Sequence, residues 1–364
     1  MNDFTFTVID PDQIRAAELV LPCTDLSKAL DFYTNDLGFR TDAIFPADAP
    51  RIAVVSGYGV RIRLEHDTDA APNRMRLLLN DIQPGSSKSD ELFAPDGTRI
   101  EFAPVVSPLK LPQLKPAFVL RLAGEGSWSP GRAGMQYRDL IPNRLGGRYI
   151  ASHIRIPNGG PVPDYVHHHH VRFQMIYCYK GWVKVIYEDQ GPPFVMKAGD
   201  CVLQPPHIRH RVLECSDNME VIEISCPAEH ETLVDHVMEL PTTSVHLDRD
   251  YNGQRFVYHR LSKAKWRPGP FDGFEARDTG IDKATRGFAS VRVIRSGGEP
   301  KSPSLRHKGE FAFNFVLQGH ATLQRHRKPQ QSIGAGDSFV IPAGIVIDLG
   351  NCSDDLELLQ VSSK

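Results

Sequence analysis

The sequence lacks the features of an exported, membrane-spanning or nucleic-acid-binding protein. Its six cysteines form no CxxC pair and no regular framework, which favours reduced thiols over disulfides. No apolar run reaches the roughly 20 residues that span a bilayer, and the opening MNDFTFTVIDPD has neither the basic nor the apolar part of a signal peptide. The formal charge of −2 comes with no basic cluster. We therefore expect a cytoplasmic protein that binds a small molecule, without nucleic-acid or membrane partners.

Helical periodicity is also scarce, and turn-forming residues are plentiful instead. The 29 glycines and 28 prolines divide the chain into many short, strand-like segments. A length of 364 residues corresponds to about two or three domains. Pro104, Pro108, Pro112 and Pro116 recur every four residues, which favours an extended linker. We place a domain boundary at this linker, residues 105–116.

The chain after the linker contains an internal repeat. WSPGRAGMQYRD begins at Trp128, and WRPGPFDGFEARD begins at Trp266. Further landmarks follow in the same order: ASHIRIPNGG corresponds to ASVRVIRSGG, YCYKGWVKV to NFVLQGHATL, and AGDCVLQPP to AGDSFVIPA. Residues 117–240 and 241–364 are therefore predicted to be two copies of one β-rich domain, an antiparallel sandwich or barrel of the jelly-roll type.

Residues 1–104 show a different pattern. Strand-like segments surround TDLSKALDFYTNDLGF, in which Thr24 or Asp25 can cap a helix and Gly38 can end it. This order predicts a β-α-β-β unit. The chain as a whole is therefore predicted to be mainly β, with an α+β domain at its N-terminus.

Four consecutive histidines lie in VHHHHVRFQ, residues 166–174. Successive side chains of a strand point to opposite faces. Counting from Gln174, we predict that His168 and His170 share its face, while His167 and His169 point away.

A further histidine, His210, follows the Pro-Pro turn of GDCVLQPPHIRH. If this segment pairs antiparallel with the first, His210 can meet His168 and His170 inside the barrel. Three imidazoles and one side-chain oxygen suit a divalent first-row transition metal.

These two segments resemble the motifs of the cupin superfamily, and residues 117–364 resemble its double jelly-roll members, the bicupins. The first motif is HxH, three or four residues, a glutamate, six residues and a glycine. It reads HHHVRFQMIYCYKG here, with Gln174 in place of the glutamate. The second motif is a glycine, five residues, Pro-x-Gly, two residues and a histidine. It reads GDCVLQPPHIRH, with His207 in place of its second glycine.

The resemblance implies tandem cupin β-barrels and a metal-dependent enzyme. Three-histidine cupins resemble dioxygenases, which bind Fe(II) and use open positions for a chelating substrate and O₂. We therefore expect one divalent transition metal on His168, His170 and His210, with Fe(II) favoured and Mn, Ni, Co, Cu or Zn as alternatives. Gln174 would be a weak fourth ligand or a hydrogen-bond donor to bound oxygen. His207 is a second catalytic candidate, or else a residue of the turn.

The exchange of glutamate for Gln174 removes one negative charge from the expected site. A divalent ion among neutral groups is locally more positive, which favours an anionic substrate. The scaffold also carries isomerases, lyases and decarboxylases. A metal-dependent isomerase or lyase, and a small-molecule-binding bicupin without turnover, therefore stay open as alternatives.

The second copy has none of the expected ligands. Opposite His168, His170, Gln174 and His210 it has other residue types, namely Arg306, Lys308, Ala312 and Ile347. Arg306 and Lys308 could hold an anion or simply be solvated. We expect this copy to have a structural role or to form a homodimer.

Residues 17–104 resemble the glyoxalase/bleomycin-resistance group, the vicinal oxygen chelate superfamily, in TDLSKALDFYTNDLGF and APDGTRIEF. The resemblance implies paired βαβββ modules with metal ligands on the sheet, and Glu18 and Glu101 fall at such positions. The second module looks truncated, and its expected histidine is missing. Two glutamates alone make a poor transition-metal site, so we expect residues 1–104 to be a degenerate domain without catalysis.

Overall fold

The computed structural model describes the chain except for residues 1–10, 67–73, 80–91, 94–98, 106 and 298–301. The chain divides into two compact units. Unit 1 comprises residues 1–110 and 231–236, and unit 2 comprises residues 111–230 and 237–364. In the part of the chain that the structure describes, no helix is long and apolar enough to cross a membrane.

The described residues of unit 1 form a mixed sheet with helical segments before β1 and between β1 and β2. Its strands lie in the order β2-β3-β4-β1-β5-β7-β6, and β1 pairs with β4, and β5 with β7, in parallel. The strands are β1 (Ile14–Cys23), β2 (Arg40–Phe45), β3 (Ile52–Gly57), β4 (Val60–His66), β5 (Arg74–Leu79), β6 (Leu92–Phe93) and β7 (Arg99–Pro104). The 3₁₀ turn η1 (Pro11–Gln13) precedes β1. The sheet includes β2, which the sequence analysis missed.

The helix of unit 1 begins where its cap predicts. The Asp25 carboxylate accepts a hydrogen bond from the backbone N–H of Lys28 at 3.1 Å, and α1 (Leu26–Asp31) continues into the π-turn η2 (Phe32–Asp36). Gly38, at φ +70°, then turns the chain into β2. Leu26 packs on β3 and β4 through a buried cluster that contains Ala53, Val55, Ile62 and Leu64.

A short strand from far along the chain completes this sheet. β20 (Thr232–Val234) pairs antiparallel with β2, Ile44 opposite Thr232. The sequence analysis assigned these residues to the first β-rich copy, residues 117–240. The repeat comparison could not separate them, because its last landmark, AGDCVLQPP, ends before β20.

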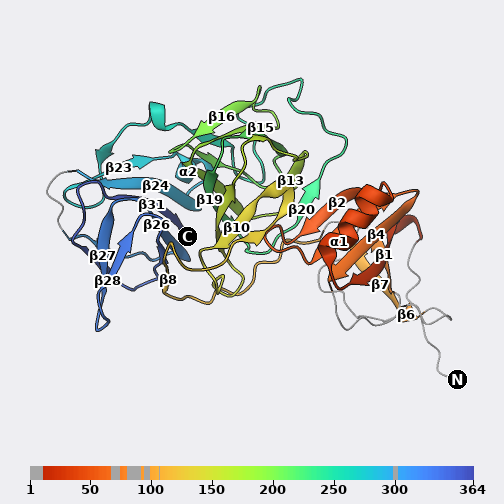
Figure 1. Ribbon diagram of the computed structural model, residues 1–364, viewed down its shortest axis with the longest axis horizontal. Coiled ribbons are helices and arrows are strands. Elements are labelled where there is room, and N and C mark those ends of the chain that lie inside the picture. The colour runs from red at the N-terminus through yellow and green to blue at the C-terminus, as the bar shows by residue number, and fades with distance from the viewer. Residues whose placement is uncertain (1–10, 67–73, 80–91, 94–98, 106, 298–301) are drawn as a thin grey trace. The chain divides into compact units, whose positions relative to one another are not determined.

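Unit 2 contains two β-barrels, one for each predicted copy (Figure 1). The first barrel consists of two sheets. One sheet is β16 (Phe194–Lys197), β15 (Trp182–Tyr187), β18 (His210–Cys215) and β13 (His167–His169), with β12 (Gly160–Pro161) on β18. The other is β21 (Val257–His259), β17 (Cys201–Leu203), β14 (Phe173–Lys180), β19 (Met219–Cys226), β11 (Ile150–Ile156), β10 (Gln136–Asp139) and β9 (Ser129–Pro130).

The second barrel repeats this plan. One sheet is β22 (Arg267–Pro268), β23 (Phe274–Asp278), β24 (Ala289–Ser296), β31 (Glu357–Ser363), β26 (Phe311–Gln318), β29 (Ser338–Val340) and β8 (Val119–Arg121). The other is β25 (Ser304–Leu305), β30 (Ile347–Gly350), β27 (His320–Arg325) and β28 (Gln331–Gly334). Helical turns of unit 2 are η3 (Arg132–Gly134), η4 (Leu261–Lys263) and α2 (Ile281–Ala284).

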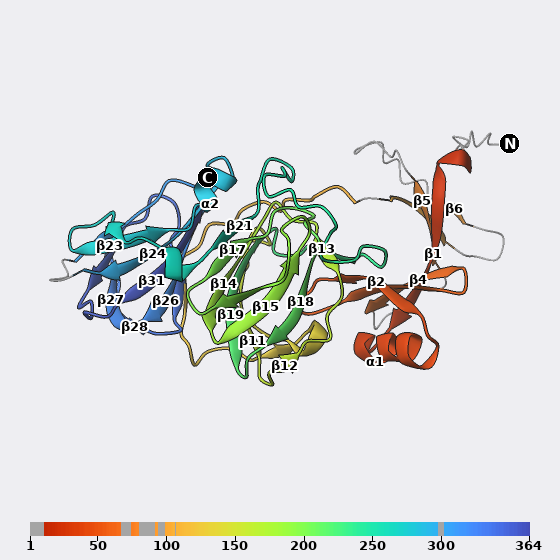
Figure 2. The ribbon, with the colours of Figure 1, turned by 90° about the horizontal axis from the view of Figure 1, so that it is seen from above.

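The two copies exchange one strand each. β8 precedes the first barrel in sequence but pairs with β29 of the second, Leu120 opposite Phe339. β21 precedes the second barrel but pairs with β17 of the first, Tyr258 opposite Val202. The two barrels lie side by side in Figure 2. Each barrel is therefore completed by the strand that leads into the other.

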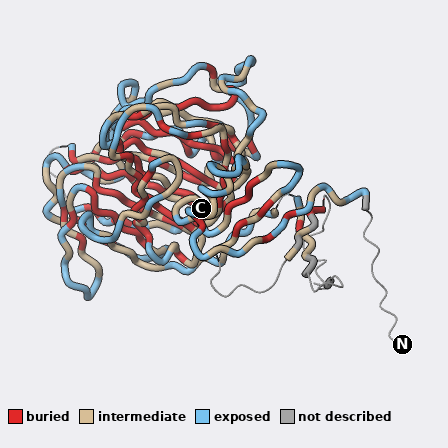
Figure 3. The backbone as a smooth tube through the Cα atoms, turned by 45° about the vertical axis from the view of Figure 1, so that its right-hand side comes forward, coloured by how far each residue is buried: buried red, intermediate tan, exposed pale blue. Residues whose placement is uncertain are grey.

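An apolar core joins the barrels between these exchanged strands. The alternate residues Phe173, Met175 and Tyr177 of β14 pack in one cluster with the aromatic side chains of β26, Phe311, Phe313 and Phe315. Figure 3 shows buried residues along the strands of the barrels. The opposite face of β14 lines the interior of its own barrel, where Ile176 and Cys178 contact the inner cluster. Burial on both faces explains the nearly continuous apolar run of this strand.

Two arginines cross this junction in opposite directions. Arg277 of β23, 1% exposed, donates to the Gly199 carbonyl oxygen at 3.0 Å and to the Tyr177 hydroxyl at 2.8 Å. Arg138 of β10 donates to the Gly336 carbonyl oxygen at 3.3 Å. Both arginines belong to the R-D of the repeat, and both glycines to its A-G-D. The repeat therefore encodes the contact between its two copies.

Replacement of Arg277 by Met is expected to lower the free energy of unfolding by about 2–4 kcal/mol, because it leaves the Gly199 carbonyl and the Tyr177 hydroxyl without their buried donor. Urea unfolding of the full chain measures this. Arg267→Met on the adjacent β22, where the side chain is exposed, serves as the control and should change the value by less than about 0.5 kcal/mol. Equal effects of the two substitutions would show that the crossing arginine does not stabilise the junction.

Candidate functional site

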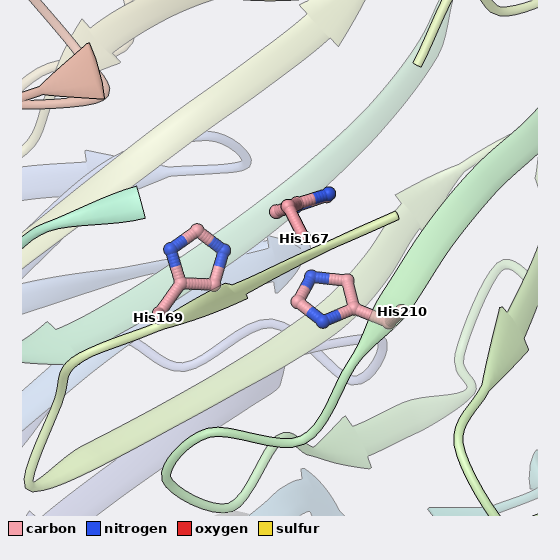
Figure 4. A group of neighbouring side chains, drawn as sticks. All are labelled: His167, His169 and His210. Atoms are coloured by element: carbon pink, nitrogen blue, oxygen red, sulfur yellow. The ribbon is translucent and has the colours of Figure 1, made fainter. Parts of the chain in front are cut away.

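Three buried histidines meet inside the first barrel (Figure 4). His167 and His169 come from β13, and His210 comes from the start of β18. One nitrogen atom of each ring lies within 4.8 Å of the others. Pairing of β13 with β18 places His167 opposite His210. In the described residues this is the only group of three or more histidine, cysteine or acidic side chains with such spacing.

The predicted orientation of His168 and His170 is wrong. Both are only partly buried, and both lie beside His207, with ring centroids 5.4 and 5.0 Å from it. Side chains do alternate along β13, but this strand ends at His169. Residues 170–172 then form an irregular turn before β14, so the face of Gln174 cannot be counted back to the histidines. Metal binding by His168 or His170 is untested, but neither lies in the cluster.

Backbone carbonyls hold two of the clustered rings in one tautomer. His167 Nδ1 donates to the Tyr165 carbonyl oxygen at 2.8 Å, and His210 Nδ1 donates to the Ile208 carbonyl oxygen at 3.0 Å. The lone pair of each ring is then on Nε2. Metal-binding histidines in proteins are commonly oriented in this way.

Burial keeps the clustered imidazoles neutral. It lowers the pKa of His210 to about 4, and it lowers the pKa values of His167 and His169 well below the usual 6.5. Mutual proximity of the rings, and the charge of Arg132, act on His167 and His169 in the same direction. A neutral imidazole is the form that binds a metal ion.

A fourth buried histidine, His230, lies next to the cluster and was missed by the sequence analysis. Its ring centroid is 5.4 Å from that of His169, and its Nδ1 donates to the Pro227 carbonyl oxygen at 3.1 Å. Burial lowers its pKa to about 4. No motif spacing in the sequence relates His230 to the histidine run, because a loop after β19 brings it there.

Gln174 is buried on the inner face of β14. Its amide is neutral, but it contacts a charged side chain of the neighbouring strand. Its side-chain nitrogen donates to the Glu223 carboxylate of β19 at 3.3 Å. Tyr187, whose ring stacks on His210 at 5.4 Å, is also under the influence of Glu223, which adds to burial in raising the pKa of Tyr187. The carboxylate that the motif lacks at position 174 is therefore present on the neighbouring strand. Alternation in MEVIEIS could have placed Glu223 on the inner face.

An ion pair borders the cluster. The guanidinium of Arg132 donates to the Asp164 carboxylate, and its other terminal nitrogen lies 2.5 Å from His167 Nε2. The Asp164 side chain is fully buried and also accepts from the backbone N–H of Val212 at 2.9 Å. Burial lowers the pKa of Arg132, but the charge of Asp164 and its hydrogen bond, together with Tyr137 and Tyr165, raise that pKa above its usual value. The guanidinium is therefore a fixed positive charge at the edge of the site.

Gln204, directly after β17, is a buried amide of the first barrel. The residue is 1% exposed. It lies two residues after Val202, which packs in the inner cluster. Neither its side-chain oxygen nor its side-chain nitrogen has a hydrogen-bond partner among the described residues. Buried amides without partners are rare, and this one leaves a donor and an acceptor for a ligand or a water molecule.

The four positions of the second barrel that correspond to the expected ligands lie as follows. Arg306 and Lys308 are exposed, while Ala312 and Ile347 lie in the barrel wall. These four positions bring together no imidazole or carboxylate.

In unit 1, arginines occupy the place where the resemblance implies a metal. Arg76 of β5 lies between Glu18 and Glu101, with N–O distances of 3.5 and 3.9 Å, and Arg61 donates to Glu18 at 2.7 Å. Both glutamates are therefore engaged in ion pairs. Residues 94–98, at the start of APDGTRIEF, lie outside the described residues.

Comparison with known proteins identifies the barrels. The family model "Cupin domain" matches twice, at residues 152–225 and 291–362. Each match lies within one of the two barrels. The first match includes the histidine segments of β13 and β18, and the second covers most of the second barrel. No match is found among the curated proteins.

Solved structures resemble the tandem arrangement. A putative glyoxylate-induced protein from Pseudomonas aeruginosa matches with a TM-score of 0.50 and 13% identity, over 71% of this chain and 93% of that one. Oxalate decarboxylase from Bacillus subtilis matches with a TM-score of 0.49 and 12% identity, over 68% and 76%. Protein Ylba from E. coli matches with a TM-score of 0.49 and 11% identity, over 69% and 92%. Such identities show the fold alone. The fold is thus a bicupin, while the vicinal oxygen chelate resemblance of residues 1–104 stays a prediction.

The buried histidines make the stability of the metal-free protein depend on pH. The unfolded chain binds protons below about pH 6.5, while His230 in the folded chain stays neutral down to about pH 4, so stability is lost as the pH falls between these values. Replacing His230 by Gln should reduce the slope of unfolding free energy against pH by up to about 1.4 kcal/mol per pH unit in this window. Urea unfolding between pH 4.5 and 6.5, in chelator, tests this.

The control for this experiment is His246→Gln, since the His246 side chain is exposed. Its slope should equal that of the unsubstituted chain. An unchanged slope for the His230 variant would mean that His230 takes up its proton in the folded state as readily as in the unfolded one.

Proposed function

We propose that the first cupin domain binds one divalent transition metal through His167, His169 and His210, and that the protein is a metal-dependent enzyme for a small anionic substrate. The observation that carries this proposal is the buried cluster itself, with its ring nitrogens within 4.8 Å of one another. Three imidazoles leave coordination positions for other ligands, and such sites are typical of catalytic rather than structural metals.

The residues around the cluster fit a cation. The three rings are neutral, and their Nδ1 hydrogen bonds direct the lone pairs of His167 and His210. Arg132 and Asp164 form an ion pair at the cluster. The Glu223 carboxylate accepts hydrogen bonds from Gln174 and Ser225, and a carboxylate in the same barrel as three neutral imidazoles is compatible with a divalent ion.

Arg132 supports an anionic substrate. One terminal N–H of Arg132 is hydrogen-bonded to the lone pair of His167 Nε2. A cation bound at that nitrogen would displace this N–H. Asp164 would keep the guanidinium beside the site. A guanidinium at the edge of a buried site recognises carboxylate groups through paired hydrogen bonds.

Within this proposal, we favour an Fe(II)-type dioxygenase reaction. A bound metal would supply Lewis-acid and redox chemistry at the open positions. The polar side chains that surround the cluster would orient the substrate: Arg132 binds its carboxylate, and the amides of Gln174 and Gln204 donate hydrogen bonds. A metal-dependent isomerase or lyase, and a bicupin that binds a ligand without turnover, are the alternatives.

Replacement of His169 by Ala should reduce metal content to less than about a tenth of that of the unsubstituted chain. The two remaining histidines bind a transition metal far more weakly than three do. His168→Ala, on the adjacent residue outside the cluster, is the matched control and should retain the metal. Elemental analysis of both purified proteins measures this. Retention of metal by the His169 variant, or its loss from the His168 variant, would contradict the assignment.

Oxygen consumption distinguishes the reaction classes. The Fe(II)-loaded protein is offered small hydroxy acids and aromatic carboxylates, and oxygen uptake is followed together with the loss of substrate. Uptake that needs both metal and substrate supports the dioxygenase. Substrate loss without oxygen uptake would favour the isomerase or lyase, and tight binding without turnover would favour the binding protein.

A further inference from the structure

The second cupin barrel encloses a small polar cavity of its own. Its volume is about 100 Å³. The polar side chains that line it are Ser290, Arg292, His307, Asn314, Gln360 and Ser362. None of the described residues around the cavity is acidic, and a second arginine, the exposed Arg306, lies at its edge. This barrel has lost the histidine cluster, yet its interior is not filled with apolar side chains.

Strand register relates this cavity to the interior of the first barrel. In the second barrel Gln360 of β31 pairs with Arg292 of β24 and with Asn314 of β26. In the first barrel Glu223 of β19 pairs with Ser152 of β11 and with Ile176 of β14. The two rows occupy equivalent positions, because Ile176 lies five residues before Gly181 and Asn314 lies five residues before Gly319, the glycines that follow β14 and β26. The same row of the fold therefore carries a carboxylate in one copy and a guanidinium in the other.

Hydrogen bonds link the side chains of Arg292, Gln360 and Asn314 and hold them in place. Arg292 Nε donates to the Gln360 side-chain oxygen at 2.9 Å, and the Gln360 side-chain nitrogen donates to the Asn314 side-chain oxygen at 2.9 Å. The two terminal nitrogens of Arg292 and the side-chain nitrogen of Asn314 have no acceptor among the described residues. Asp278, opposite Arg292 in the ladder, accepts a hydrogen bond from the backbone N–H of Gly280. Burial lowers the pKa of Arg292, and the charge of Asp278 only partly offsets this. Donors without acceptors thus face a cavity.

His307 contributes an acceptor at the same cavity. Its Nε2 donates to the Ile341 carbonyl oxygen at 2.6 Å, which places the lone pair of a neutral ring on Nδ1. Nδ1 is buried and has no partner in the described part of the chain. The cavity therefore offers a guanidinium for a negative group and an imidazole lone pair for a hydroxyl group.

The volume limits what can bind. A cavity of about 100 Å³ is smaller than the roughly 150 Å³ that admits benzene. This space suits an anion of about five heavy atoms and excludes nucleotides or sugar phosphates. The planar guanidinium matches the geometry of a carboxylate.

We propose that the second cupin domain is a binding site for a small carboxylate, with Arg292 as its anchor, and that a hydroxyl group on the ligand binds His307. The metal site and the carboxylate site are then separate functions of the two copies. The proposal does not depend on metal binding by the first barrel.

Titration calorimetry of the full chain, treated with chelator, tests this with sodium glycolate as the probe. Glycolamide, the neutral analogue of the same shape, is the ligand control. Glycolate should bind, and glycolamide should bind at least about tenfold more weakly because it cannot pair with a guanidinium. Absence of glycolate binding, or equal binding of the two compounds, would overturn the proposal.

Three variants locate the site. Arg292→Gln should weaken glycolate binding by about tenfold or more. Gln360→Glu should do the same while preserving the fold, because a glutamate can still accept from Arg292 Nε and neutralises it internally. Arg295→Gln lies on the same strand but outside the cavity, where the arginine binds Glu275 and covers Trp266, and should leave the affinity within about twofold. Affinity retained in both cavity variants would place glycolate elsewhere, for example at Arg132.

Discussion

The reciprocal hydrogen bonds of Arg138 and Arg277 are the constraint on which the bicupin depends. A buried guanidinium is costly unless it has hydrogen-bond acceptors, and each of these donates to a backbone carbonyl of the other barrel, that of Gly336 or Gly199. Separation of the barrels would therefore remove an acceptor from each guanidinium. The exchange of β8 and β21 acts in the same direction, because each long sheet would lose an edge strand.

This mutual dependence frees the two interiors to diverge. The faces that join the barrels must remain complementary, and they carry the aromatic side chains of β14 and β26 in one core. The inner faces have no such restriction, so one copy can have a histidine cluster while the other has Gln360 and Arg292 at the register positions of Glu223 and Ser152. The second barrel still packs on the first, and its inner row carries the guanidinium of Arg292 where the row of the first barrel carries the carboxylate of Glu223.

The sequence predicted the architecture better than the site. The two copies, the helix cap at Asp25 and the tandem barrels follow from landmarks within short segments, and they are present. The predicted orientation of the four histidines was wrong because it assumed strand alternation from Gln174 back to His168. Alternation does not hold across the turn at residues 170–172. Glu223 and His230 were missed for a related reason. Alternation in MEVIEIS can place Glu223 on the inner face, but its contact with Gln174 arises from pairing between distant strands, and His230 reaches His169 through a loop.

The position of Glu223 changes how the unusual glutamine is understood. The motif alone suggests that Gln174 deprives the site of a negative charge. The structure shows that the amide donates to a carboxylate on the adjacent strand, so the charge is displaced by one strand rather than lost. A carboxylate held by an amide is less able to approach an ion than a free one, and it can remain a hydrogen-bond acceptor. The first barrel is then suited to a cation held chiefly by imidazoles, with Arg132 on one side to attract an anion and Glu223 on another to keep the total charge low.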